Sequence, residues 1–125
     1  MATVTIPFGG NSLQFEVPDR NLAQVLKPNA SSPLADLDAA IHAALDSPIG
    51  QPPIEQWVKP SNRVLLVSDD NTRLTPVDRM IPPLLTRLNA AGVPDRNIAC
   101  IMALGTHRYM TDEEMTAKVG QAVAR

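Results

Sequence analysis

The sequence contains very little cysteine, since Cys100 is its only thiol. A single cysteine excludes a disulfide within the chain and any metal site that needs several thiolates. Cys100 lies inside an apolar stretch and is expected to be buried and chemically inert. Histidine is scarce too, and His42 has no second histidine or cysteine at a metal-ligand spacing. We therefore expect a structural role for His42.

The sequence also lacks a run of positive charge and a long apolar segment. Its 11 basic and 13 acidic side chains give a net charge of −2, with no basic stripe that would follow nucleic acid phosphates. No apolar run approaches the ~20 residues that cross a bilayer, and the start "MATVTIPFGG" has no signal-peptide pattern. We expect one α/β domain in a cytoplasmic protein that binds neither nucleic acid nor membrane.

The first half of the chain contains clear signals of local secondary structure. Apolar and polar residues alternate over 3–8 and 12–17 around a Gly-Gly pair, which predicts a β-hairpin. Residues 21–26 are expected to form a helical turn. Apolar spacing after a Ser-Pro start predicts an amphipathic helix over 33–46, and the proline-rich residues 47–62 are expected to be a connection.

The second half alternates strand and helix. Residues 64–68 and 98–104 are apolar throughout, which is typical of strands covered on both faces. Between them, helical spacing from Pro76 to Gly92 predicts a helix, with a kink or a restart at Pro82 and Pro83. The fold class is therefore α/β, with an open, mostly parallel sheet, flanking helices and an N-terminal hairpin.

A last helix is expected to begin at Thr111, where "TDEE" matches a capping box with Glu114. The acids of this first turn need no chemical role, because they favour the helix dipole.

Two polar segments follow the two predicted strands. Parallel strands joined by a helix have their carboxyl ends on one edge of the sheet, where open α/β sheets bind ligands. "SDDNTR" and "GTHR" leave that edge, so we expect Asp70, Arg73, His107 and Arg108 to converge there. Histidine is a neutral-pH acid/base, and arginine suits a carboxylate or a phosphate.

Each polar loop also has a plain structural interpretation. Asp and Asn after a strand often form a helix cap or an Asx turn, and a loop histidine is often only solvated. Three hypotheses follow: a catalytic edge, a non-catalytic module that binds a small anion, and an edge that docks a partner chain.

The order of the hairpin, "VPDRNLAQVL", "VSDDNTRLTP" and "ALGTHRYMTDEEM" resembles the N-terminal domain of the nickel-pincer lactate racemase family, also called the LarA family. The resemblance covers nearly the whole chain. Its most specific parts are an Asp-x-Thr-Arg element at residues 70–73 and a Gly-x-His-Arg element at residues 105–108.

The resemblance implies racemisation or epimerisation of a 2-hydroxy acid such as lactate, with hydride transfer to a nickel pincer nucleotide. His107 matches one of two acid/base histidines of the family. Asp70 and Arg73 match a polar pair of the family's site, which is expected to hold the cofactor, the substrate or His107 itself. Thr72 and Arg108 belong to the same two motifs and are assigned with them to cofactor or substrate binding. The family's covalent lysine, nickel ligand and second histidine lie in segments that this sequence does not contain. Residues 1–125 are therefore expected to be the N-terminal α/β domain without its C-terminal domain, and to be inactive alone.

Overall fold

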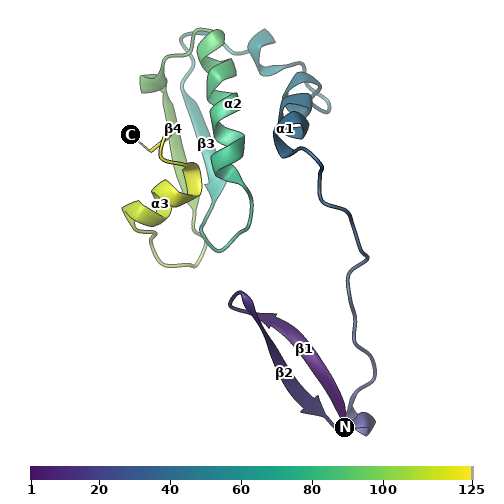
Figure 1. Cartoon of the computed structure of the whole chain (residues 1–125). Coiled ribbons are helices and arrows are strands. Elements are labelled where there is room, and N and C mark those ends of the chain that lie inside the picture. The colour runs from purple at the N-terminus through teal and green to yellow at the C-terminus, as the bar shows by residue number, and fades with distance from the viewer. Residues whose placement is uncertain (125) are drawn as a thin grey trace. The chain divides into compact units, whose positions relative to one another are not determined.

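The computed structural model describes residues 1–124, which form two units (Figure 1). The first unit is Met1–Pro33, and the second begins at Leu34. The candidate site lies within the second unit.

The first unit is the predicted hairpin. Strand β1 (Ala2–Phe8) pairs antiparallel with β2 (Asn11–Val17). Gly9 and Gly10 make the connection with φ of 54° and 84°, values that favour glycine. The alternating pattern therefore predicted this element correctly.

The helical turn expected at 21–26 is wrong. A single 3₁₀ turn covers Asp19–Asn21 instead, and the backbone N–H of Asn21 donates to the Pro18 carbonyl at 2.8 Å. The turn starts early because proline fixes its own φ, here −56°, at the entry to the turn. Leu22 then adopts an extended conformation, which ends the turn.

Helix α1 (Leu37–Asp46) opens the second unit and begins later than the predicted residue 33. The side chain of Asp36 caps it by accepting the backbone N–H of Ala39 at 2.9 Å. Aspartate is among the strongest N-caps, so its position determines the first turn. Leu34, which the periodicity placed in the helix, is exposed before it.

Strands β3 (Val64–Asp69) and β4 (Ile98–Ala103) are parallel neighbours, as predicted. Their register pairs Val64 with Ile98 and Asp69 with Ala103, so both strands end at the same level. The residues that follow them therefore emerge at a common edge.

Helix α2 (Val77–Ala90) crosses between these strands as one helix, so of the predicted kink or restart at Pro82 and Pro83 the restart is absent. Each proline removes one backbone hydrogen bond. The helix nevertheless continues because its apolar face stays packed from end to end, with Ile81 and Leu88 buried.

Helix α3 (Asp112–Val119) has the capping box predicted at Thr111. Helices α2 and α3 cover the same face of the sheet (Figure 1). The core between them joins side chains of β3, β4, α2 and α3, namely Leu66, Met102, Val77, Ile81 and Val119.

Residues 34–124 leave side chains on the opposite face of the sheet exposed. Leu65 is 59%, Val67 67% and Ile101 52% exposed. The expectation of cover on both faces is therefore wrong for residues 34–124. The expected burial of Cys100 is also wrong, since this residue is exposed although it pairs in register with Leu66 of the core. An apolar strand shows that cover is favourable, but it does not show which segment supplies the cover.

Among residues 1–124, no helix is both long enough and apolar enough to cross a membrane.

Candidate functional site

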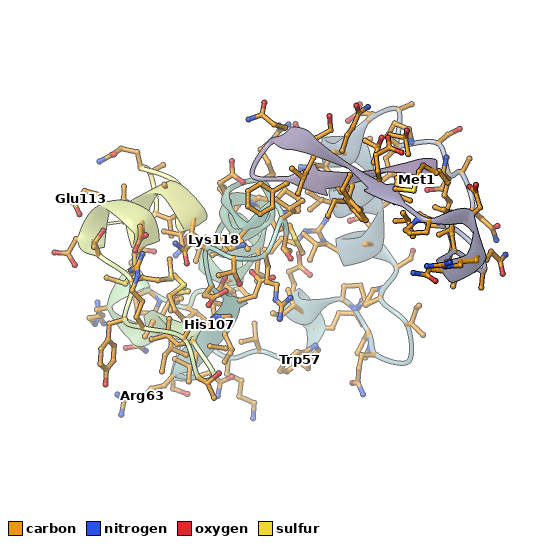
Figure 2. The ribbon with its side chains drawn as sticks, turned by 90° about the horizontal axis from the view of Figure 1, so that it is seen from below. Met1, Trp57, Arg63, His107, Glu113 and Lys118 are labelled. Carbon is orange, nitrogen blue, oxygen red and sulfur yellow. The ribbon has the colours of Figure 1, made fainter. Side chains whose placement is uncertain are left out.

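The carboxyl edge of the β3–β4 sheet carries two polar loops. Residues 70–76 connect β3 to α2, and residues 104–111 connect β4 to α3. Both loops lie at the lower end of this unit in Figure 1, and Figure 2 shows the protein from below. Figure 2 labels His107 of the second loop and Lys118 of α3.

Asp70 is the buried centre of this edge, with 3% of its surface exposed. Its Oδ1 accepts the hydroxyl of Thr72 at 2.6 Å and the backbone N–H of Thr72 at 3.1 Å. These two bonds form an Asx-type turn, which the sequence also allowed as a purely structural role for Asp70. The other oxygen, Oδ2, contacts Nδ1 of His107, so Asp70 shapes its own loop and also joins the second loop.

Hydrogen bonds from Thr72 and from His107 lower the pKa of Asp70 from 3.8 to about 2. Asp70 is therefore ionised at neutral pH and can only accept hydrogen bonds. The hydrogen in the contact must then belong to Nδ1 of His107, and in the neutral imidazole the lone pair of Nε2 is free. The imidazole remains 48% exposed, so a ligand can reach Nε2.

The turn that presents His107 depends on Gly105. Gly105 has a φ of 58°, and the backbone N–H of His107 donates to the Leu104 carbonyl at 3.0 Å. Positive φ is strained for most side chains, so glycine suits this position. The turn brings the imidazole back over the end of β3.

Arg73 follows in the Asp70 loop and is anchored there by its backbone, whose N–H donates to the Asp70 carbonyl at 3.2 Å. Its guanidinium is exposed and forms no hydrogen bond or ion pair with residues 1–124. It is therefore available to an anion.

Arg108 does not join this group as expected. Its guanidinium donates to both carboxylate oxygens of Glu114 on α3, at 2.7 and 2.8 Å, and to the Tyr109 carbonyl. A bidentate pair of this kind satisfies the charge that a ligand would otherwise meet. The expected convergence is thus correct for Asp70 and His107, whereas Arg108 faces the helix.

Sequence reasoning missed two residues of α3 that contact the loops. Glu114 was assigned only a capping role, and Lys118 was not considered. Lys118 is buried and binds the loop after β3 through its ammonium group. Their spacing of four residues places both on one face of a helix, which was the available signal.

Hydrogen bonds from Arg108 and from the Thr111 backbone lower the pKa of Glu114 from 4.5 to about 2. Because the folded pKa values of Asp70 and Glu114 are depressed, their stabilising contribution is present above the ordinary values near 4. It is lost only as the pH falls toward about 2. Both carboxylates therefore keep their charge throughout the neutral range.

The described residues do not supply a metal centre. No group of three or more His, Cys, Asp or Glu side chains within residues 1–124 is arranged to hold a metal ion. His42 lies on α1 and lines a different groove, together with Arg79 and Arg87. The donors at the edge suit proton transfer and anion binding.

A second, apolar groove of about 770 Å³ lies between α1, β3 and α2. Aliphatic side chains such as Leu37, Ile41 and Met80 line it, and neither Asp70 nor His107 does. The carboxylate that lines it, Asp69, is paired with Lys118, so the polar edge is the stronger candidate for chemistry.

Comparison with known proteins identifies the family. The family described as "Lactate racemase N-terminal domain" matches residues 8–125. The chain is 29% identical over 125 residues to a lactate racemase from Lactiplantibacillus plantarum, covering 98% of this chain and 29% of that protein. It is 28% identical over 123 residues to a lactate racemase from Thermoanaerobacterium thermosaccharolyticum, covering 97% and 29%.

A solved structure gives the same assignment. The lactate racemase apoprotein from T. thermosaccharolyticum superposes with a TM-score of 0.69 and 27% identity, covering 98% of this chain and 28% of that one. The chain thus spans less than a third of the length of these relatives. Because the family match extends over nearly all of the sequence and includes both polar loops, the chain belongs to the lactate racemase N-terminal domain family.

Proposed function

We propose that this domain supplies one half of the active site of a 2-hydroxyacid racemase of the lactate type, with His107 as its acid/base residue. The observation that supports this best is the contact between the buried Asp70 and Nδ1 of His107. It leaves an exposed Nε2 with a free lone pair at the ligand-binding edge of the sheet.

In this proposal Nε2 of His107 takes the proton of the substrate's C2 hydroxyl and later returns it. Positioned proton transfer of this kind contributes about 10²–10⁴-fold to a rate. The ionised Asp70 stabilises the imidazolium that forms and keeps the ring oriented. A nickel pincer nucleotide, when bound, supplies acceptance and return of the C2 hydride.

The residues present fit only part of such a cofactor site. The guanidinium of Arg73 suits the substrate carboxylate or a nucleotide phosphate. Residues 1–124 contain no cluster of three or more His, Cys, Asp or Glu side chains arranged to hold a metal ion. We therefore assign the nickel ligand and the covalent attachment to the part of the relatives beyond the matched 29%.

Deuterium labelling tests the reaction class. A longer form of the protein, loaded with cofactor, is incubated with one enantiomer of lactate in D₂O. We expect the opposite enantiomer to form with protium retained at C2, because the same hydride returns to carbon. Incorporation of solvent deuterium at C2 would indicate carbanion chemistry and contradict the proposal, and so would an absence of racemisation.

The chain of 125 residues is expected to retain no nickel and to racemise no lactate. It would be produced in cells that also make the cofactor, purified, and analysed for metal, with the longer protein as the positive control. Nickel at one equivalent in the short chain would show that the half-site assignment is wrong.

Arg73→Ala is expected to raise KM for lactate, or to lower cofactor occupancy, by about 10- to 100-fold, because charged hydrogen bonds contribute ~1.5–3 kcal/mol. Arg73→Lys should recover only part of the loss, since lysine lacks the two-pronged geometry. Kinetics and metal content of the longer protein separate the two effects. Wild-type KM and occupancy in both variants would remove Arg73 from the site.

A further inference from the structure

We propose that Glu114 and Lys118, one turn apart on α3, are positioning residues that hold the two catalytic loops together and thereby hold His107 against Asp70. This rests on the proposed function for its catalytic meaning. The loops concerned are residues 70–76 and residues 104–111, and we call the two α3 side chains the α3 brace.

Glu114 contacts both loops at once. From the first loop, the side-chain amide of Asn71 donates to Oε1 at 2.9 Å. From the second, Arg108 donates to both carboxylate oxygens. The capping box needs only the 2.9 Å bond from the Thr111 backbone N–H to Oε2. The remaining bonds go beyond what a helix cap requires.

Lys118 binds the first loop from the next turn of the helix. Its ammonium donates to the backbone carbonyls of Arg73 at 2.9 Å and Thr75 at 3.2 Å, and lies 2.8 Å from Oδ1 of Asp69. The ammonium therefore makes two hydrogen bonds to backbone carbonyls and one ion pair. The hydrogen bonds from Lys118 and Thr75 also lower the pKa of Asp69, so the ion pair persists at neutral pH.

The burial of Lys118 makes this contact important. Only 7% of its side chain is exposed, and a buried ammonium is costly unless its partners are in place. The path of the 70–76 loop and the position of α3 are therefore linked. Asp69 ends β3 directly before Asp70, and Arg73 follows Asp70 in the loop, so a change at Lys118 is expected to move the carboxylate that faces His107.

The brace is tested with Lys118→Met and Glu114→Gln. Methionine keeps a long apolar side chain without the charge, and glutamine keeps the shape and a cap acceptor while weakening the Arg108 pair. Glu113→Gln is the matched control, since Glu113 is an exposed neighbour on α3 (Figure 2), and the hydrogen bonds from Asn71 and Arg108 go to Glu114 instead. Lys118→Arg keeps the positive charge and tests whether the charge alone restores the function that Lys118→Met loses.

The first readout is the ¹⁵N chemical shifts of the His107 ring in the 125-residue chain at neutral pH, which report which nitrogen carries the hydrogen. We expect the wild type and Glu113→Gln to show hydrogen on Nδ1. Glu114→Gln and Lys118→Met should shift toward a mixture of both tautomers. Circular dichroism checks that each variant is folded, and Glu114→Gln decides the question if Lys118→Met does not fold.

The second readout is turnover in the longer, cofactor-loaded protein. We expect kcat to fall about 10- to 100-fold in Glu114→Gln and Lys118→Met with KM within a few-fold of wild type, because small misplacements of a catalytic group have effects of this size. Lys118→Arg should recover part of the loss. Folded variants with a wild-type ring signature and wild-type kcat would overturn the proposal. A changed ring signature, combined with wild-type turnover in His107→Ala, would leave the brace standing and reject the proposed function.

Discussion

Replacing His107 with alanine is expected to lower lactate turnover about 10²–10⁴-fold in the longer, cofactor-loaded protein, because the substitution removes the acid/base group. Cofactor attachment should be unchanged, since the nickel ligand is assigned elsewhere. The thermal midpoint should change little, because the imidazole is 48% exposed and lies outside the core cluster. The measurements are chiral analysis of lactate, nickel content and thermal unfolding.

His42→Ala is the control for this experiment. It removes the other histidine, which lies on α1 away from the polar edge, and should leave turnover at the wild-type level. If His107→Ala turns over lactate at the wild-type rate with nickel loaded, the histidine is structural. The edge would then be better described as a module that binds an anion.

Asp70→Asn is expected to lower kcat by an amount approaching that of the His107 change, although it alters only one atom of a buried side chain. The amide can present N–H to Nδ1 and force the ring hydrogen onto Nε2, the nitrogen that must accept the substrate proton. Loss of a carboxylate that fixes a histidine tautomer lowers turnover by up to about 10⁴-fold in comparable catalytic sites. Steady-state kinetics should show the loss in kcat rather than KM.

Thr72→Val separates this electrostatic effect from a loop effect. Valine keeps the branched shape but removes the hydroxyl that donates to Asp70 at 2.6 Å. Asp70 would stay ionised, so the tautomer of His107 should stay the same and the decrease in kcat should be small. A decrease in Thr72→Val as large as that in Asp70→Asn would mean that loop shape, and not the carboxylate charge, controls the site.

The elements that sequence reasoning located best are those specified by neighbouring residues. The hairpin at 3–8 and 12–17 needs only alternation and a glycine pair, and the capping box needs only Thr111 and Glu114. The boundaries that were wrong involve competition between local signals. Asp36 proved the effective N-cap, although Ser32 and Pro33 also formed a plausible start. The apolar face of α2 continued past two prolines because the core packs along the whole helix.

The site residues can likewise be divided into those whose positions the sequence predicted and those whose positions it did not. A parallel strand–helix–strand unit has the segments after both strands at one edge, so its topology alone predicts that Asp70 and His107 lie together. Arg108 was expected beside them because its position in the motif adjoins His107. A guanidinium reaches several ångströms from its backbone, and that of Arg108 binds both carboxylate oxygens of Glu114.

The sequence by itself determined the local elements, the α/β class and the family, because periodicity, turn residues and ordered motifs lie within short stretches of chain. Only the tertiary structure decided which polar groups pair across the loops. The contact of Asp70 with His107 spans 37 positions and that of Lys118 with Arg73 spans 45. Such contacts depend on the packing of α3 against the sheet, and the partners of a charged side chain are set by distance and burial in space rather than by neighbours along the chain.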